Sequence, residues 1–459
     1  MLIHPYIPNS DLETKKEMLR EIGVKSAEEL FADIPEKIRY NKRLNLPPPK
    51  SEYEVRRHVE SLLSRNKTSG ELVSFLGAGC WPHYVPAVCD EINSRSEFLT
   101  AYAGDVYTDL GRYQAFFEFQ SMIGELVAMD VVSFPWYDWG TVAGDAARMA
   151  LMITDRHEIL VPRTMSPERL AILQTYCEGQ ADIKLINNDH ESGQISLEDL
   201  KSKISSKTAA VYIENPTYLG FIETEADEVS HIAHQYGALF IVGVEPLSLG
   251  LLTPPGEYGA DIVCGEGQPL GMHMYFGGAL LGFLACRDDE KLMSTVPHRL
   301  ITITKTATKG EWGFTYVLPE RTMFAAREKA KSFTGTATAL WAITAAVYLS
   351  LLGPKGIREL AQVIMEKSHY AIKRVSEIRG VKVPAFKASH FKEFTVNFDS
   401  SRKSVEEINR KLLQSEIIGG KDISKEFPEL GNTSLFCVTE IHGRADIDKL
   451  AAALQEAVQ

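Results

Sequence analysis

The chain has 459 residues, of which 44% are hydrophobic and 24% are charged, a balance that is typical of folded globular proteins and excludes a disordered or fibrous one. A single hydrophobic core stops growing well below this length, so we expect a large domain and at least one smaller one. The formal net charge of -12 argues against nucleic acid as a partner, because nucleic-acid-binding proteins gather Lys and Arg on one face.

No segment has the pattern of a signal or a membrane span. The first residues are acidic and contain prolines, without a basic region followed by an apolar run, so we expect no secretory signal. The most apolar segment, 338–352, is too short to cross a bilayer, and its Ala and Leu content favours a buried helix. We therefore expect a cytoplasmic protein with no membrane partner.

Residues 1–70 form a predicted N-terminal arm. Polar amphipathic helices are predicted at 11–22 and 26–33, followed by a proline-rich extended stretch at 44–50 and a helix at 52–64. Such an arm buries little apolar surface by itself, so it must lie across its own body or a partner subunit, and we favour a partner.

Residues 71–320 form a predicted large α/β domain. Strands at 157–162, 182–186, 209–214 and 238–244 alternate with helices at 146–153, 167–176, 197–204 and 226–236. Alternation at this spacing is typical of βαβ crossovers and predicts a mostly parallel sheet with helices on both faces.

The last third of the chain has a different pattern. Residues 321–352 are good helix formers without proline and predict a long helix that links two domains. Residues 353–459 form a predicted smaller α+β domain, with helices at 357–378, 405–415 and 446–458 and strands at 393–398 and 434–439.

The six cysteines are scattered without a C-x-x-C pair, and no histidines have the spacing of metal ligands. We expect reduced, mostly buried thiols and no metal site.

Loops that follow the predicted strands are the candidate functional segments, since an open α/β sheet places its ligand at the carboxyl ends of its strands. Residues 136–141 lead directly into a helix, so the N–H groups near Gly140 and the Thr141 hydroxyl could hold a phosphate. A plain helix cap explains the same residues.

Two further loops resemble the large domain of fold-type I pyridoxal-phosphate enzymes. Asn215 follows one strand and Glu245 follows the next; in that family an acidic residue faces the pyridine nitrogen and a lysine about twenty residues later forms the Schiff base. Gln268 stands at this distance instead of a lysine. Lys305 and Lys309 lie in a polar stretch that predicts an exposed hairpin, whereas a Schiff-base lysine needs a dry pocket.

Ordered sequence blocks along the whole chain carry a closer resemblance. They are EELFADIP (28–35), LNLPP (44–48), FLGAG (75–79), HYVPAV (83–88), SRSEFLTAY (94–102), FEFQ (117–120), PLSLG (246–250), PGEYGAD (255–261), GEGQPLG (265–271), FGG (276–278), REKA (327–330) and IIGG (417–420). With these blocks the chain resembles subunit 1 of the two-subunit P-protein, the glycine decarboxylase of the glycine cleavage system.

This resemblance implies an enzyme subunit that acts only with its partner. Subunit 2 would hold the pyridoxal phosphate on its lysine, and the pair would decarboxylate glycine and pass the aminomethyl group to the lipoylated H-protein. The resemblance implies a vestigial cofactor site at Gly140, Thr141, Asn215, Glu245 and Gln268, with no cofactor bound covalently to this chain. It also suggests His83 and Tyr102 as supporting catalytic residues, and a homodimer or heterotetramer.

Departures from the family pattern leave two alternatives open. The loop after Tyr102 is one residue shorter than in the family, Trp139 replaces a small residue, and Lys331 and Phe333 enter a polar turn. These changes are typical of a divergent paralogue that acts with a partner on another amino acid or amine. They are also consistent with a non-catalytic scaffold subunit, because a fold persists while site chemistry diverges.

Overall fold

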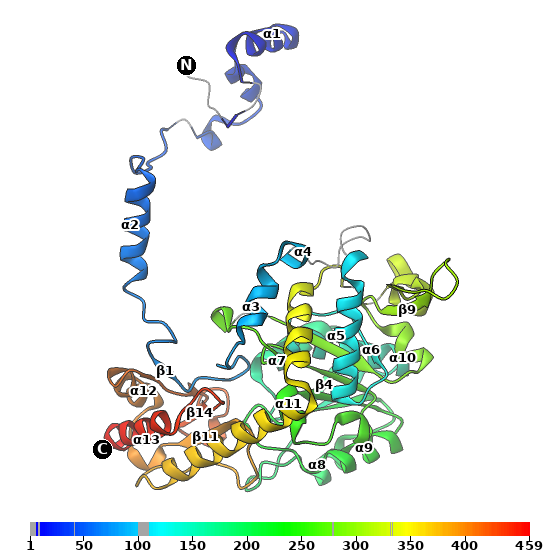
Figure 1. Ribbon diagram of the computed structural model, residues 1–459, viewed down its shortest axis with the longest axis vertical. Coiled ribbons are helices and arrows are strands. Elements are labelled where there is room, and N and C mark those ends of the chain that lie inside the picture. The colour runs from blue at the N-terminus through cyan, green and yellow to red at the C-terminus, as the bar shows by residue number, and fades with distance from the viewer. Residues whose placement is uncertain are drawn as a thin grey trace. The chain divides into compact units, whose positions relative to one another are not determined.

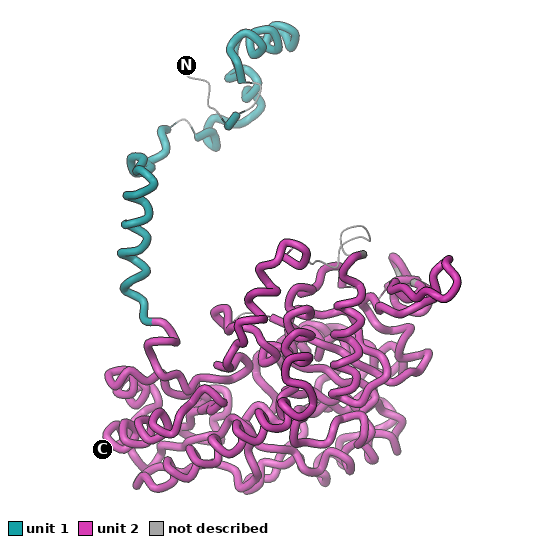
Figure 2. The backbone as a smooth tube through the Cα atoms, viewed as in Figure 1, with its two compact units in different colours: residues 1–67 teal, residues 68–459 magenta. Residues whose placement is uncertain are grey.

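The computed structural model describes residues 6–7, 10–40, 42–99, 110–277, 280–330, 332 and 334–459. Contacts divide the chain into two compact units, residues 1–67 and residues 68–459, which Figure 2 shows in different colours. Each unit is described by itself below.

The described residues of the first unit form two α-helices, both near the predicted positions. Helix α1 (Leu12–Ile22) begins at Asp11, whose carboxylate accepts from the N–H groups of Glu13 and Thr14. Helix α2 (Glu52–Leu63) begins with a capping box between Ser51 and Glu54. None of the described side chains of residues 6–67 is buried within this unit.

The helix predicted at 26–33 is wrong in type. Residues Ala27–Phe31 form the short 3₁₀-helix η1, and Glu36–Ile38 form a second one, η2. Ser26 makes no side-chain cap, and Pro35 lacks an N–H group and disfavours helical backbone in the residue before it. An α-helix therefore cannot extend through this segment.

A seven-stranded sheet forms the centre of the second unit (Figure 1). Its strands, in spatial order, are β2 (Val131–Val132), β8 (Gly282–Cys286), β7 (Ile262–Glu266), β6 (Leu239–Val244), β5 (Thr208–Glu214), β3 (Glu158–Pro162) and β4 (Asp182–Ile186). Strand β8 is antiparallel to both of its neighbours, β2 and β7, and the other pairs are parallel. This confirms the predicted fold class, a mostly parallel sheet in an α/β domain.

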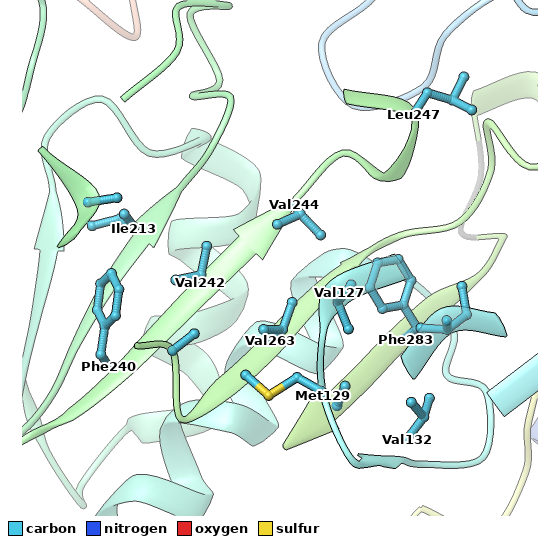
Figure 3. Packing of buried hydrophobic residues seen from close by; sticks show 14 of the residues in the cluster. Val127, Met129, Val132, Ile213, Phe240, Val242, Val244, Leu247, Val263 and Phe283 are labelled. Atoms are coloured by element: carbon cyan, nitrogen blue, oxygen red, sulfur yellow. The ribbon is translucent and has the colours of Figure 1, made fainter. Parts of the chain in front are cut away.

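Apolar clusters cover both faces of this sheet. One cluster joins the sheet to α5 (Tyr113–Val127), α9 (Ala226–Gln235) and α11 (Ala339–Ser376), and the other joins it to α6 (Trp139–Thr154) and α7 (Pro167–Cys177). Figure 3 shows side chains of the first cluster, including Val242 and Val244 of β6, Val263 of β7 and Phe283 of β8. The buried runs of β5 and β7, and of β6 after its first residue, are typical of central parallel strands.

The linking helix predicted at 321–352 is wrong in its bounds. The chain first forms the 3₁₀-helices η7 (Pro319–Arg321) and η8 (Met323–Lys329), and α11 begins only at Ala339, after the Gly- and Thr-rich segment 334–338. Helix α11 is kinked at Gly353, which adopts φ 58°, and Pro354 starts its second helical stretch, which ends at Ser376.

By length and composition alone α11 could cross a membrane, but 44% of its most apolar window is buried inside the protein. Figure 1 shows α11 beside α5, with which it is in contact, and packing explains its apolar residues.

The C-terminal elements lie close to their predicted positions. A three-stranded antiparallel sheet contains β11 (Glu393–Asn397), β14 (Thr433–Cys437) and β13 (Lys421–Asp422), with α12 (Val405–Gln414) and α13 (Arg444–Val458) against it. Strand β1 (Val73–Ser74) pairs with β12 (Ile417–Ile418). The domain boundaries placed at 320 and 352 stay predictions.

The remaining elements are short. They are α3 (Ala87–Ser94), α4 (Ser96–Leu99), η3 (Leu110–Arg112), α8 (Leu197–Lys203), η4 (Pro246–Gly250), η5 (Pro255–Tyr258), η6 (Tyr275–Gly277), α10 (Glu290–Thr295), η9 (Asp399–Ser401) and η10 (Pro428–Leu430). Strands β9 (Ile301–Lys305) and β10 (Trp312–Tyr316) form the predicted hairpin, and Lys305 and Lys309 are exposed on it. All six cysteines are free and five are buried, as predicted.

Candidate functional site

The candidate site lies at the carboxyl ends of three central strands. Strand β5 ends at Glu214, β6 ends at Val244 just before Glu245, and β7 ends at Glu266. Parallel strands deliver these carboxylates to one edge of the sheet, which is where open α/β sheets place their ligands. The C-terminal segment 391–393 meets this edge, and Gly220 permits it, since a Cβ there would lie 1.9 Å from the Glu393 carbonyl oxygen.

Gln268 is buried and bonded on every side. Its Oε1 accepts from the Trp81 N–H at 3.0 Å, and its Nε2 donates to the carbonyl oxygens of Trp81 at 3.1 Å and Met272 at 3.0 Å. Only 1% of the residue is exposed. The amide therefore holds Trp81 against the loop that follows β7, and both its oxygen and its nitrogen are already hydrogen-bonded within the chain.

Lys392 is the central cation of the site. Its Nζ lies 3.1 Å from Glu245 Oε1, 3.1 Å from His83 Nε2 and 3.6 Å from the centre of the Trp81 ring. The side chains of Lys392 and Glu245 are only 3% and 5% exposed. A protein interior tolerates buried charges when they are paired in this way.

His83 joins Lys392 to a second carboxylate. Its Nδ1 lies 2.8 Å from Glu440 Oε2, and the other Glu440 oxygen accepts from the Tyr84 N–H at 2.6 Å. Burial alone would raise the pKa of Glu440, but the His83 ring and the Tyr84 N–H outweigh burial and lower this pKa to about 2. With only 1% of its side chain exposed, His83 is held inside the chain.

Arg169 is a second buried cation. Its Nε and Nη2 donate to both oxygens of Glu214, at 2.6 and 2.8 Å, in the bidentate geometry that guanidinium and carboxylate groups favour. The Trp139 ring covers the guanidinium, with its centre 4.0 Å from Cζ, and the Trp139 indole N–H donates to the Tyr212 hydroxyl at 3.1 Å. Trp139 thus fills this part of the site with its own side chain.

The N-terminus of α6 is capped by carboxylates of the chain. Asp138 Oδ1 accepts from the Thr141 N–H at 2.7 Å, and Glu266 Oε2 accepts from the Trp139 N–H at 3.3 Å. Gly140 lies against α7, where a Cβ would come within 2.4 Å of Ile172. The plain helix cap that the sequence left open thus accounts for Gly140 and Thr141.

Glu266 is fully buried and bonded to three N–H groups. Besides Trp139 N–H, its Oε1 accepts from the N–H groups of Gln268 at 3.1 Å and Leu281 at 3.2 Å. Burial raises the pKa of Glu266 to about 8, against the effect of these hydrogen bonds, and Asp138 nearby adds to the increase. The raised pKa favours the protonated form of this carboxyl group at the end of β7.

The other predicted site residues are placed as follows. Asn215 turns to Glu223, exchanging hydrogen bonds of 3.0 and 3.1 Å with its main chain, and does not reach the network. Glu245 also caps the 3₁₀-helix η4 through the Ser248 N–H at 2.9 Å. Tyr102, Lys331 and Phe333 lie outside the described residues.

The space left at the site is small. A cavity of about 20 Å³ remains between Trp81, Trp139, Arg169, Thr217 and Lys392, which is room for about one water molecule. Among the described residues, no group of three or more His, Cys, Asp or Glu side chains could hold a metal ion.

The sequence predicted Glu245, Gln268 and His83 but missed their partners. Arg169 carried a signal, because it shares the buried stripe of α7 with Leu173 and Cys177, where a charge is out of place. Lys392 carried no such signal, since it lies 309 residues from His83 and simply precedes a strand.

Three comparisons relate the chain to known proteins. The family model described as glycine cleavage system P-protein matches residues 4–454. A protein of Staphylothermus marinus named probable glycine dehydrogenase (decarboxylating) subunit 1 is 44% identical over 464 residues, which cover 99% of this chain and 98% of that protein.

Solved structures agree with these sequence matches. The crystal structure of a glycine decarboxylase (P-protein) of the glycine cleavage system, in inhibitor-bound form, matches with a TM-score of 0.84 and 34% identity, and the match covers both chains completely. A glutamate decarboxylase of Lactobacillus brevis matches with a TM-score of 0.70 and 12% identity over 94% of this chain and 97% of that one, which is a likeness of fold alone.

Proposed function

The chain belongs to the glycine cleavage system P-protein family, and from this premise we propose that it is the subunit of a two-subunit glycine decarboxylase that carries no Schiff-base lysine. The second subunit binds the pyridoxal phosphate, which supplies the electron sink for loss of carbon dioxide. The assembled enzyme decarboxylates glycine and passes the aminomethyl group to the lipoylated H-protein.

The observation that carries this proposal is the buried amide of Gln268. It stands about twenty residues after the acidic Glu245, where a cofactor-binding chain of this fold has its lysine, and all its bonds go to Trp81 and Met272. An amide nitrogen cannot form an imine, whereas a neutral lysine amine in a dry pocket can.

The residues of this site do not fit a pyridoxal phosphate molecule. The remaining space of about 20 Å³ holds one water molecule, while a substituted pyridine ring with a phosphate needs several times that volume. Asp138 and Glu266 already accept from the N–H groups of Thr141 and Trp139 at the start of α6, so these groups are not free to hold a phosphate. We therefore assign no chemical step to this site.

Lys392 does not serve as a substitute for the missing lysine. Its ammonium group pairs with Glu245 at 3.1 Å and lies 3.6 Å from the centre of the Trp81 ring, so partners within this chain surround it. A charged ammonium has no lone pair with which to attack an aldehyde, so Lys392 is a structural cation in this proposal.

The N-terminal arm supports assembly with a second subunit. Apolar side chains stay exposed along both of its helices, including Met18 and Ile22 on α1 and Tyr53, Val59 and Leu63 on α2. On α2, Val55, Val59, Leu62 and Leu63 have the spacing of one helical face. We propose that the second subunit covers this apolar surface in the complete enzyme, a heterotetramer in the simplest case.

Three departures in the sequence suggested a changed substrate, and the structure removes one of them. Trp139 packs on Arg169 and bonds to Tyr212 inside this chain's own filled site, so it has no bearing on a substrate pocket in the partner. Of the other two, most of the loop after Tyr102 and both Lys331 and Phe333 lie outside the described residues. Glycine is therefore the substrate that the family membership favours.

Reconstitution tests the proposed function. The protein is mixed with its lysine-bearing partner, pyridoxal phosphate, glycine and lipoylated H-protein, and labelled carbon dioxide is followed into the glycine carboxylate. We expect exchange only when both subunits are present. Equal exchange by the partner alone would make this chain a scaffold, and exchange with another amine but not with glycine would establish the paralogue.

A further inference from the structure

Two exposed aromatic residues, which we call the aromatic turn, follow the loop that contains Gln268. Phe276 is fully exposed, with a relative exposure of 110%, and Tyr275 is 44% exposed. A single exposed apolar side chain is ordinary on a protein surface, so exposure alone does not indicate a binding function for this turn.

The backbone of the aromatic turn is strained. Tyr275 has φ 40° and Phe276 has φ 64°, and Gly277 follows with φ 75°. Left-handed backbone is costly for bulky residues, because Cβ approaches the following carbonyl oxygen, and such strain gathers where surrounding structure and function demand it. Gly and Asn adopt left-handed backbone at a lower energetic cost, yet these two positions hold aromatic residues.

The base of the turn is held firmly by the large domain. The Tyr275 ring lies 5.0 Å from the Trp341 ring, and His273 Nε2 lies 3.0 Å from an Asp90 carboxylate oxygen on α3. The Met274 carbonyl oxygen accepts from the Gly277 N–H at 2.7 Å. These contacts hold His273 and Tyr275 against the large domain, while the Phe276 side chain is fully exposed to solvent.

Further exposed apolar side chains lie on the segment that contacts His273 through Asp90. Val88 is 39% exposed on α3, the helix bonded to His273, and Tyr84 is 65% exposed just before it. The same segment contributes Trp81 and His83 to the filled site. The exposed apolar side chains therefore border the sheet edge at which members of this fold place their ligand.

We propose that Phe276 is an anchor that inserts into an apolar pocket of the lysine-bearing second subunit. This inference rests on the proposed function, which identifies the second subunit as the binding partner. Rigid aromatic side chains surrounded by further apolar surface are typical of the residues that dominate binding energy at interfaces. A second copy of this chain would be a poor occupant, because it would bring two filled sites together without a lysine.

Binding measurements with the full-length chain and its partner test the anchor. Phe276→Ala should raise the dissociation constant of the pair about thirtyfold, the effect of an interface hot spot. The melting temperature of the isolated variant should equal that of the wild type, since the side chain touches solvent only. Tyr236→Ala is the matched control, because Tyr236 is 42% exposed next to the amino end of β6, at the opposite edge of the sheet.

The outcomes separate this inference from the proposed function. If the wild-type chains do not pair at all, the proposed function is wrong, and the second subunit is then not the binding partner of Phe276. If they pair and exchange carbon dioxide, but Phe276→Ala stays within twofold of wild type, only the anchor is wrong. The assignment of the occupant is overturned if Phe276→Ala abolishes self-association of this chain, or binding of H-protein, and leaves the pair intact.

Discussion

Replacing Lys392 with methionine tests the ionic network of the filled site. Methionine keeps the length and apolar stem of the side chain but removes the ammonium group that Glu245 and His83 face at 3.1 Å. Removing one partner of a buried ion pair leaves the other charge uncompensated and costs about 3–5 kcal/mol in the free energy of unfolding. The side chains of Lys392 and Glu245 are 3% and 5% exposed, so solvent screening does not reduce this cost.

Thermal unfolding of the isolated protein gives the readout. At about 2 °C for each kcal/mol in a domain of this size, Lys392→Met should lower the melting temperature by about 6–10 °C. The double variant Lys392→Met with Glu245→Gln should recover part of the loss, because it removes the stranded charge. Lys387→Met is the matched control and should have no effect, since Lys387 and its partner Glu191 are 77% and 68% exposed. A melting temperature within 2 °C of wild type for Lys392→Met would refute the reasoning.

Three further predictions concern the same site. Gln268→Lys should not form a pyridoxal-phosphate adduct, because Trp139 and Arg169 fill the site; a borohydride-stable adduct on residue 268 would show that they can move aside. Trp139→Ala should cost about 3–5 kcal/mol of unfolding free energy in denaturant titration, as a large cavity does, and a loss below about 1 kcal/mol would contradict the tight packing around it. Because the pKa of Glu266 is about 8 in the folded chain and 4.5 ordinarily, the folded state holds more protons between these values, and stability falls as pH rises through this window. Glu266→Gln should make the melting temperature depend less on pH between pH 5 and 8. Similar contributions from Glu223 and Asp145 should remain, because burial raises their pKa values to about 7 and 6. An unchanged slope would contradict a buried carboxyl group at the end of β7.

The fold was largely predictable because its signals are local. Strands β3 to β6 lie within a residue or two of their predicted bounds, since each is a short apolar run between a helix and a turn. Strands β7 and β8 were missed because a loop, and not a helix, connects them, and glycines interrupt their apolar runs. The start of α11 was misplaced because residues 321–329 include good helix formers, while in the folded chain they belong to the 3₁₀-helices η7 and η8.

The candidate site was only partly predictable, because its energetics depend on contacts between distant segments. The missing lysine at Gln268 could be found by spacing along the chain, and the Asp138 cap could be weighed against phosphate binding. That Trp81, Arg169 and Lys392 fill the same space follows only from the folded chain. Lys392 precedes a strand of the C-terminal sheet, while its partner Glu245 follows β6, and no local pattern connects them.

Reductive trapping shows which of the two subunits carries the cofactor. The isolated chain and the assembled pair are each incubated with excess pyridoxal phosphate, reduced with borohydride and analysed by intact mass and peptide mapping. The account predicts no stoichiometric adduct on the isolated chain and one adduct per pair, on a lysine of the second subunit. A single stoichiometric pyridoxyl adduct on a buried lysine of this chain, Lys392 above all, would contradict it.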